Sequence, residues 1–358
     1  MARLFGVSYT RAELLERVGD IGQIAGVRFG QLEDGFERGV RTLDFRTGSG
    51  FAFTVLPDRG MDIGQAVVGT APLTWQSATT HVGPAFYEPE GTGWLRGFAG
   101  GLLASCGLTT YGSPGMDDDQ ALGLHGRASY TPATHVAYGG EWQGDEYEIW
   151  GSGQLREAAV FGENLLLRRR VSARLGESRV VVEDVITNAG YKTTPFMLMY
   201  HCNFGFPLVS EDTELLVNSS VTPRDDQAAQ GLGDHRHFQP PTPEYRPQVF
   251  YHRLAANTEG TAQAALVNRR FASGAGLGVV LRYRLDELPC LVQWKMMGQG
   301  TYVCGLEPGT NWVGGRAKER AEGRLRHLEP GETRTFHLEI SVLTSPAEIE
   351  ALARTSPH

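Results

Sequence analysis

The segment Asp145–Leu155 (DEYEIWGSGQL) alternates polar and apolar residues, which is typical of a half-buried β-strand. Two further segments follow it, Leu165–Ala173 (LLLRRRVSA) and Arg179–Ile186 (RVVVEDVI), and both are rich in branched apolar residues. The short stretch between them, Leu175–Ser178 (LGES), has the length and the glycine of a hairpin turn. Together these segments predict antiparallel β-structure.

The same pattern continues on both sides of this stretch. Glycine accounts for 46 of the 358 residues, well above an average share of about 7%, and the glycines are dispersed. Dispersed glycine between short β-rich runs indicates many tight turns in an all-β protein. Further strands are expected at Val27–Gln31, Gly39–Phe45, Gly50–Leu56, Phe196–Tyr200, Glu214–Val217, Gly276–Tyr283 and Thr333–Val342.

Signals for helices stand out only near the chain ends. Thr10–Glu13 (TRAE) has the pattern of a capping box and predicts a short helix over about residues 10–19, ended by Gly19. Ser345–Glu348 (SPAE) repeats the pattern with proline at the first helical position, and it predicts a helix over about residues 345–354. We expect both short helices to pack at the rim of the β-core.

The length of 358 residues suits two average domains or one large all-β domain. No break in composition separates two parts of the chain. The proline-rich segment Gln239–Pro247 (QPPTPEYRP) has the length of a loop and not of a domain linker. We therefore expect a single domain over residues 1–358.

The composition also limits partners and location. The net charge is −8 and no run of Lys or Arg forms a stripe, so nucleic acid is disfavoured as a partner. No apolar run approaches the ~20 residues that span a membrane, and the N-terminal residues lack the apolar core of a signal peptide. The chain has four cysteines, which lie far apart in the sequence: Cys106, Cys202, Cys290 and Cys304. This spacing is typical of buried free thiols, and we therefore expect the protein in a reducing cytoplasm.

Common catalytic motifs are missing from the chain. It has no Walker loop, no G-x-G-x-x-G opening a helix, no H-E-x-x-H and no G-x-S-x-G, which argues against nucleotide enzymes, zincins and α/β hydrolases. Three other segments set an ionisable residue among glycines or aromatic residues: Gly123–Arg127 (GLHGR), Met199–Phe206 (MYHCNFGF) and Tyr302–Gly309 (YVCGLEPG).

The ionisable residues of these segments are His125, His201 and Glu307. Each has an ordinary structural interpretation, respectively a turn-capping histidine, a satisfied core histidine and a solvent-exposed glutamate at a strand end. Taken together, two histidines and a glutamate at strand ends form an acid–base set. Burial would raise the pKa of the glutamate, and proton transfer needs a donor and an acceptor that titrate near neutral pH.

The chain resembles the aldose 1-epimerase (galactose mutarotase) superfamily, and most of all its uncharacterised bacterial aldose-1-epimerase-like branch. The resemblance spans about residues 50–310 and implies a supersandwich of large antiparallel sheets with a sugar cleft on one face. The segments that carry it are Leu56–Ile63 (LPDRGMDI), Gly93–Leu108, Gly123–Arg127, Phe161–Asn164, Tyr200–Leu208, Trp294–Gly298 and Gly305–Pro308.

The resemblance also implies roles for individual residues. The first family histidine lies in an H-G motif, which His125 matches. The second lies in an N-H-S-Y-F-N-type segment, which His201 matches with Tyr200 before it and Asn203-Phe204 after it. The family glutamate lies in an L-E-P segment, which Glu307 matches. The substrate-orienting arginine is Arg96 by its order in the chain or Arg59 by its motif. Further expected substrate contacts are Asp58, Asn203, Trp294 and Lys295, of which the last two belong to the branch alone.

In the implied reaction, α and β anomers of a cyclic sugar interconvert by general acid–base catalysis without a metal or an organic cofactor. Two alternatives remain open, a non-catalytic sugar-binding or sensor protein and another sugar isomerase or lyase on the same fold, including a metal-dependent one. The residues do not indicate which sugar is bound or whether the chain forms oligomers. Arg168–Arg170 could attract an anion, but strand alternation would split these side chains between two faces, so we expect them in solvent.

Overall fold

The computed structural model describes residues 1–355, and β-strands dominate it. The strands are β1 (Ala2–Leu4), β2 (Val7–Tyr9), β3 (Gly26–Gln31), β4 (Arg41–Arg46), β5 (Phe51–Leu56), β6 (Asp62–Val68), β7 (Ala71–Pro72), β8 (Ala104–Leu108), β9 (Gly115–Asp117), β10 (Gln120–Leu122), β11 (Thr134–Gln143), β12 (Glu146–Ala158), β13 (Asn164–Arg174), β14 (Arg179–Asn188), β15 (Thr194–Gly205), β16 (Thr213–Val217), β17 (Ser219–Pro223), β18 (Gln248–Leu254), β19 (Thr261–Asn268), β20 (Leu277–Arg284), β21 (Cys290–Gly298), β22 (Thr301–Gly309), β23 (Arg326–Leu328) and β24 (Thr333–Leu343).

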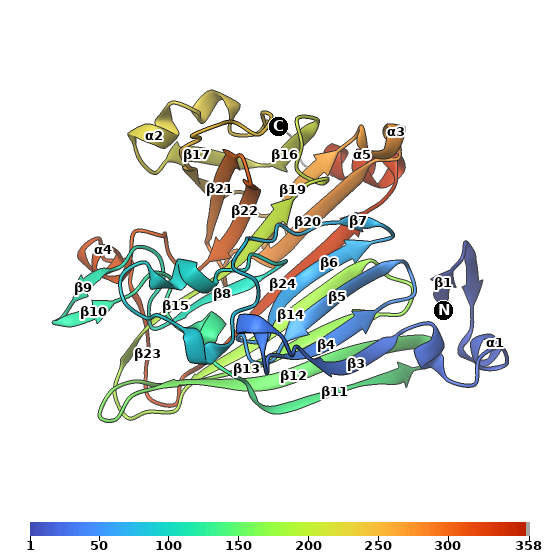
Figure 1. The fold of residues 1–358 in the computed structure, drawn as a ribbon, viewed down its shortest axis with the longest axis horizontal. Coiled ribbons are helices and arrows are strands. Elements are labelled where there is room, and N and C mark those ends of the chain that lie inside the picture. The colour runs from blue at the N-terminus through green and yellow to red at the C-terminus, as the bar shows by residue number, and fades with distance from the viewer. Residues whose placement is uncertain (356–358) are drawn as a thin grey trace.

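Most of these strands form three antiparallel sheets (Figure 1). The largest has eight strands in the order β11-β12-β13-β14-β24-β20-β19-β16. A seven-stranded sheet runs β17-β18-β21-β22-β15-β23, with β8 paired to β15, and a five-stranded sheet runs from β3 to β7 in chain order. All the strands predicted from the sequence are present, which confirms an all-β protein with large antiparallel sheets.

The hairpin predicted at Leu175–Ser178 joins β13 to β14 in the eight-stranded sheet. Gly176 in this turn has φ +81°, a conformation that a side chain would strain. In the ladder Val171 pairs with Val182, and both side chains are buried. The alternation seen in the sequence therefore sends one row of apolar side chains to the core and leaves the other row outside.

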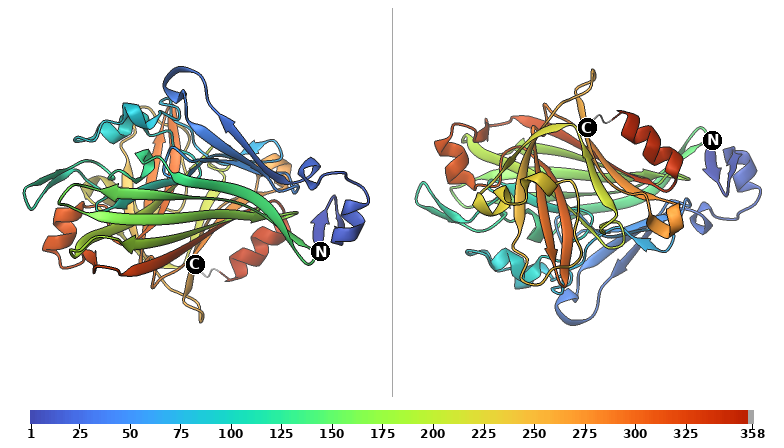
Figure 2. Two further views of the ribbon diagram at one scale, coloured as in Figure 1. Left: turned by 90° about the horizontal axis from the view of Figure 1, so that it is seen from below. Right: turned by 90° about the horizontal axis from the view of Figure 1, so that it is seen from above.

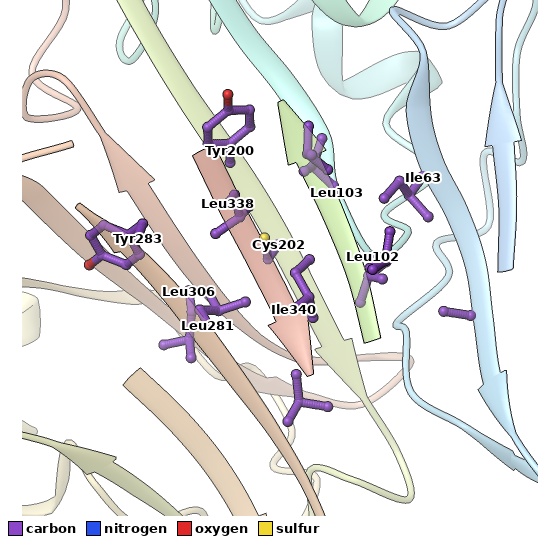
Figure 3. Packing of buried hydrophobic residues seen from close by; sticks show 14 of the residues in the cluster. Ile63, Leu102, Leu103, Tyr200, Cys202, Leu281, Tyr283, Leu306, Leu338 and Ile340 are labelled. Carbon is purple, nitrogen blue, oxygen red and sulfur yellow. The ribbon is translucent and has the colours of Figure 1, made fainter. Parts of the chain in front are cut away.

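The core lies between the sheets. Figure 3 shows side chains from three sheets meeting in it: Leu338 and Ile340 from β24, Tyr200 and Cys202 from β15, and Ile63 from β6. These residues belong to one continuous buried cluster. Because β15 contributes its even-numbered residues to this cluster, its odd-numbered residues point to the opposite face of the sheet.

Five α-helices lie within residues 1–355: α1 (Arg11–Leu15), α2 (Asp226–Ala229), α3 (Phe271–Gly274), α4 (Arg316–Ala321) and α5 (Pro346–Thr355). Helix α5 begins at the predicted place, and its apolar side packs against β16, β19 and β20. Figure 2 shows α1 beside the β1–β2 hairpin at one end of the molecule. No helix of this part of the chain has the length and hydropathy needed to cross a membrane.

The helix predictions need two corrections. Helix α1 has the predicted capping box at Thr10 but ends at Leu15, well before Gly19. Its single buried side chain is Leu14, so tertiary packing supports little more than one turn. The second correction is that α2, α3 and α4 lie inside the chain, where no helix was expected. These helices have four to six residues each, too few to produce a periodic pattern.

The side chains of Arg168–Arg170 alternate between two faces, as predicted, but the expectation that all of them lie in solvent is wrong for Arg169. Strand alternation separates the side chains, and Arg168 is exposed. Arg169, however, is fully buried, and its guanidinium binds both carboxylate oxygens of Asp184 at 2.7 and 2.5 Å. Its Nη1 also donates to Ser105 Oγ at 2.6 Å. A paired charge can be buried, and the sequence did not show that Asp184 would face Arg169.

Candidate active site

The pairing of β15 with β22 brings His201 and Glu307 together. Cys202 pairs with Leu306 in this antiparallel ladder, which sets His201 opposite Glu307 on the face directed away from the core. Opposite residues on one face of a ladder are close neighbours. Nε2 of His201 lies 3.2 Å from Oε1 of Glu307.

His125 reaches the same place from a loop after β10. Its φ is +57°, and its backbone is held by hydrogen bonds with Gly112 and Gly107. The glycines on either side of it leave no room for a side chain. A Cβ at position 123 would overlap the carbonyl oxygen of Pro89, and a Cβ at position 126 would overlap that of Thr110. The His125 ring lies 5.6 Å from the His201 ring, centre to centre. A non-glycine residue in the left-handed region is often found at functional sites.

Burial gives these three groups unusual proton affinities. Glu307 is 2% exposed, and desolvation raises its pKa to about 8, although Arg224 acts in the opposite direction. Desolvation lowers the pKa of His201 to about 4. It also lowers the pKa of His125 well below the usual value, and the neighbouring His201 adds to this effect. Near neutral pH the glutamate therefore holds a proton and both imidazoles are neutral.

The same groups have unused hydrogen-bonding capacity. Nδ1 of His125, Nδ1 of His201 and Oε1 of Glu307 are buried and make no hydrogen bond. The 3.2 Å approach of Glu307 to His201 is thus a contact without hydrogen-bond geometry. Buried polar atoms are normally satisfied, and each exception calls for an explanation such as an absent ligand.

These side chains line a cleft of about 310 Å³. This volume is in the range of small-molecule sites. Most of the lining is apolar or aromatic, with polar side chains at Ser113 and Arg224 in addition to the acid–base groups. The lining residues are Trp94, Leu95, Phe98, Gly112, Ser113, Leu124, His125, His201, Arg224, Pro247, Val249, Val292, Trp294, Glu307 and Val313.

Two of the expected substrate contacts lie in or beside this cleft. Trp294 lines it and packs against Phe98 and His201. Asn203 follows His201 on the same face of β15 but is not part of the lining. Its amide donates to the carbonyl oxygens of Gly101 and His201, at 3.1 and 2.8 Å, which ties β15 to the neighbouring loop.

Neither predicted arginine lies in the cleft. Arg59 is buried, and its guanidinium donates to the backbone carbonyl oxygens of Ser129, Val82 and Gly97. All three contacts hold neighbouring segments of the chain together. The Arg96 side chain is 75% exposed and pairs with Glu88 at 3.1 Å. The two arginines were predicted from their order in the chain and from a shared motif, and neither of these indicates where a side chain points.

Asp58 and Lys295 are also directed elsewhere. Asp58 accepts hydrogen bonds from Nε and Nη2 of the Arg41 guanidinium and one from the Arg41 backbone N–H. Lys295 follows Trp294 on β21, so strand alternation sends it to the opposite face, where Nζ donates to the Asp234 carbonyl at 3.0 Å. Trp294 and Lys295 therefore cannot both face the cleft.

The structure adds Arg224 and Ser113, which the sequence analysis missed. Arg224 follows β17, and its side chain binds Asp225 at 2.9 Å, while Asp225 also caps α2. Ser113 N–H donates to the Val313 carbonyl at 3.1 Å. The adjacent, oppositely charged residues Arg224 and Asp225 were the available signal for Arg224. No comparable signal marked Ser113.

In the part of the chain that the structure describes, no group of three or more His, Cys, Asp or Glu side chains is arranged to hold a metal ion. The four cysteines are buried free thiols, as expected.

Comparison with known proteins extends this description. Residues 37–342 match the family described as a domain of unknown function, DUF4432. A Klebsiella pneumoniae protein named as a candidate aldose 1-epimerase is 28% identical, with a TM-score of 0.87 over 92% of this chain and 86% of the other. A galactose mutarotase-like protein from Clostridium acetobutylicum is 13% identical, with a TM-score of 0.63 over 90% of this chain and 99% of the other.

The galactose 1-epimerase of Lactobacillus acidophilus is 14% identical, with a TM-score of 0.58 over 89% of this chain and 99% of the other. Among curated proteins, none matches the chain. At these low identities the last two structures establish the fold alone. The chain therefore belongs to the DUF4432 family and has a galactose mutarotase-like fold.

Proposed function

We propose that this protein is an aldose 1-epimerase, which interconverts the α and β anomers of a small cyclic sugar. The observation that carries the proposal is the buried pair of Glu307 and His201, 3.2 Å apart and without a hydrogen bond, in the lining of a cleft with apolar and aromatic walls. Buried ionisable groups with strongly shifted pKa values are typical of catalytic sites. The fold likeness to mutarotase-like proteins supports the same reaction class.

In the proposed reaction, Glu307 takes the proton from the anomeric hydroxyl while His201 gives a proton to the ring oxygen. The C1–O5 bond breaks and leaves an open-chain aldehyde. After rotation about the C1–C2 bond, the ring closes on the other face and the two groups exchange roles. One proton leaves the sugar and one enters it, so the step needs no metal or organic cofactor.

The pair must hold one proton for this exchange, since one member donates and the other accepts. Between pH 4 and pH 8 it does so, because the pKa of His201 is about 4 and that of Glu307 about 8. In the empty cleft the proton resides on Glu307, so it must pass to His201 before the ring opens by these roles. The protonated glutamate and the neutral histidine are the state from which the ring closes.

The other polar groups would orient the sugar. Nδ1 of His125, which makes no hydrogen bond, would bond the ring oxygen or a neighbouring hydroxyl. Arg224 stands at the rim of the cleft and could hold a hydroxyl group. Trp94 and Trp294 offer apolar surfaces to a sugar face. The buried free cysteines support a reducing cytoplasm as the place of action.

NMR exchange spectroscopy on a panel of neutral, deoxy and acidic aldoses tests the proposal. We expect acceleration for at least one sugar, and a loss of about 10²–10⁴-fold in Glu307→Gln and in His201→Asn. His252→Asn is a matched control, since His252 is equally buried and its pKa is also lowered to about 4, but it lies outside the cleft. This variant should retain exchange per folded molecule, and EDTA treatment should leave the wild-type rate unchanged.

Other outcomes select the alternatives. Binding without acceleration of exchange for any sugar would contradict the epimerase and favour a sugar sensor. Exchange that EDTA abolishes would favour a metal-dependent isomerase. Equal exchange in wild type and Glu307→Gln would remove Glu307 from the mechanism.

A further inference from the structure

The distribution of polar groups in the cleft bears on the kind of sugar that it accepts. The acid–base groups Glu307, His201 and His125 serve the anomeric hydroxyl and the ring oxygen in the proposed function, on which this inference rests. Apart from them, the polar side-chain groups among the described lining residues are those of Arg224 and Ser113 and the indole Nε1 atoms of Trp94 and Trp294. Nε1 of Trp94 is buried and makes no hydrogen bond, so it is free to donate to a ligand.

The remaining walls are apolar. Val249 and Val292 lie on neighbouring strands and are both nearly inaccessible to solvent. Val292 pairs with Glu307 and Val249 pairs with Trp294, so these side chains surround the acid–base pair on its own face of the sheet. Phe98 and Leu124 close other parts of the cleft. The side chains of Val249, Val292, Phe98 and Leu124 can neither accept nor donate a hydrogen bond.

A fully hydroxylated aldohexose carries hydroxyl groups on C2, C3, C4 and C6 in addition to the anomeric one. Some of these could face solvent at the mouth of the cleft, but those directed at the valine walls would lose their hydrogen bonds to water without replacement. A buried polar group without a partner is unfavourable. A sugar with CH₂ or CH₃ in place of such a hydroxyl would instead gain apolar contact.

The charges in the cleft do not favour an acidic sugar. Arg224 is the one cation among the described lining residues, and both its Nε and its Nη2 bind Asp225 at 2.9 Å. Asp225 thus offsets the charge of Arg224, and a substrate carboxylate or phosphate would have to compete with it. Glu307 would repel such an anion whenever it is ionised.

We propose that the substrate is a neutral deoxy aldose, a sugar in which at least one hydroxyl group away from C1 is replaced by hydrogen. Its apolar edge would lie against Val249 and Val292, and its remaining hydroxyl groups would meet Arg224, Ser113 and Trp94. An apolar wall discriminates only moderately against an added hydroxyl group, by up to about 10²-fold.

The test compares sugars in pairs that differ by one hydroxyl group: ribose with 2-deoxyribose, glucose with 2-deoxyglucose, galactose with 6-deoxygalactose, and mannose with 6-deoxymannose. NMR exchange spectroscopy gives kcat/KM for each, and saturation-transfer NMR measures binding separately. We expect at least one deoxy sugar to exceed its parent by about ten- to hundredfold. Glucuronate and galactose 6-phosphate form the acidic arm and should react more slowly than that deoxy sugar.

A variant sharpens the result. Val249→Thr adds one hydroxyl group to the wall without changing its volume much, and it should reduce the preference for the deoxy sugar. Val280→Thr is a matched control, because Val280 is equally buried but packs under α5, outside the cleft. It should leave the preference unchanged.

The outcomes separate the two proposals. Equal kcat/KM within every pair, with exchange that still depends on Glu307, would overturn the deoxy substrate and leave the epimerase intact. Faster exchange of an acidic sugar than of any deoxy sugar would do the same. Absence of exchange for all sugars would overturn both proposals.

Discussion

Two clusters of buried polar groups in this protein each contain a carboxyl group and differ in how completely their members are paired. In the first, between the sheets, Arg169 binds Asp184, and Asp184 also accepts the Tyr200 hydroxyl at 2.7 Å. Asp62 accepts hydrogen bonds from the hydroxyl groups of Ser105 and Ser129, each at 2.6 Å.

The second cluster, in the cleft, is Glu307 with His201 and His125. Among the described residues no arginine or lysine forms an ion pair with the carboxyl group of Glu307, and each member has a buried atom without a hydrogen bond. Residues 200 and 201 are adjacent on β15, so one strand supplies both clusters through its two faces. The comparison indicates that a buried charge needs a partner such as the one Asp184 gives Arg169, and that buried groups without such partners become neutral and keep their hydrogen-bonding atoms available for chemistry.

The largest effect should follow from breaking the paired cluster. Arg169→Met leaves the Asp184 carboxylate buried without its cation, which we expect to lower the free energy of unfolding by about 3–5 kcal/mol. Urea unfolding followed by circular dichroism measures this change. Arg168→Met, the exposed neighbour, is the control and should stay within about 0.5 kcal/mol of wild type. A small effect for both would mean that the buried pair does not stabilise the fold.

Removing the carboxyl group of the unpaired cluster should instead raise the free energy of unfolding above that of the wild type as pH rises. Burial raises the pKa of Glu307 from 4.5 to about 8, so between these pH values the folded state keeps a proton that the unfolded chain has released. This linkage lowers wild-type stability as pH rises, by up to about 1.4 kcal/mol per pH unit, and Glu307→Gln removes it.

Urea unfolding of both proteins from pH 4.5 to pH 8.5 measures the difference. The variant should gain stability over wild type progressively up to about pH 8 and then level off. Parallel stability curves across this range would show that Glu307 has an ordinary pKa in the folded protein.

The pH dependence of anomer exchange should reflect the same pair. We expect a bell-shaped kcat/KM, because the pair gains a second proton below about pH 4 and loses its only proton above about pH 8. Beyond each limit the rate should fall about tenfold per pH unit. Direct NMR exchange measurements at constant ionic strength give the profile, and a rate that keeps rising above pH 9 would contradict it.

The smallest effect concerns the space around the carboxyl group. A Cβ at position 305 would lie 2.6 Å from Oε1 of Glu307, so Gly305→Ala should displace the carboxyl group and lower kcat by about tenfold. Gly233→Ala is the control, since nothing lies within 4 Å of a Cβ there. If Gly305→Ala retains full activity, the position of the carboxyl group in the empty cleft is not the one used in catalysis.

The sequence allowed much of the fold to be predicted because alternation and glycine spacing are local properties. The strands from β12 to β14 follow from such patterns, and so does the split of Arg168–Arg170 between two faces. Alternation could also have shown that Trp294 and Lys295 point to opposite sides of β21. Motif likeness led instead to the expectation that both would bind substrate.

The sequence by itself determined an all-β architecture, the hairpin at Gly176 and the three residues now placed together as His125, His201 and Glu307. Only the tertiary structure decided which charged groups have partners, because strands far apart in the chain supply them. Asp184 pairs with Arg169, and backbone carbonyl oxygens accept hydrogen bonds from Arg59. Arg224 lines the cleft from the end of a different strand. The physical reason is that burial and pairing depend on contacts between distant segments, whereas periodicity depends on neighbours along the chain.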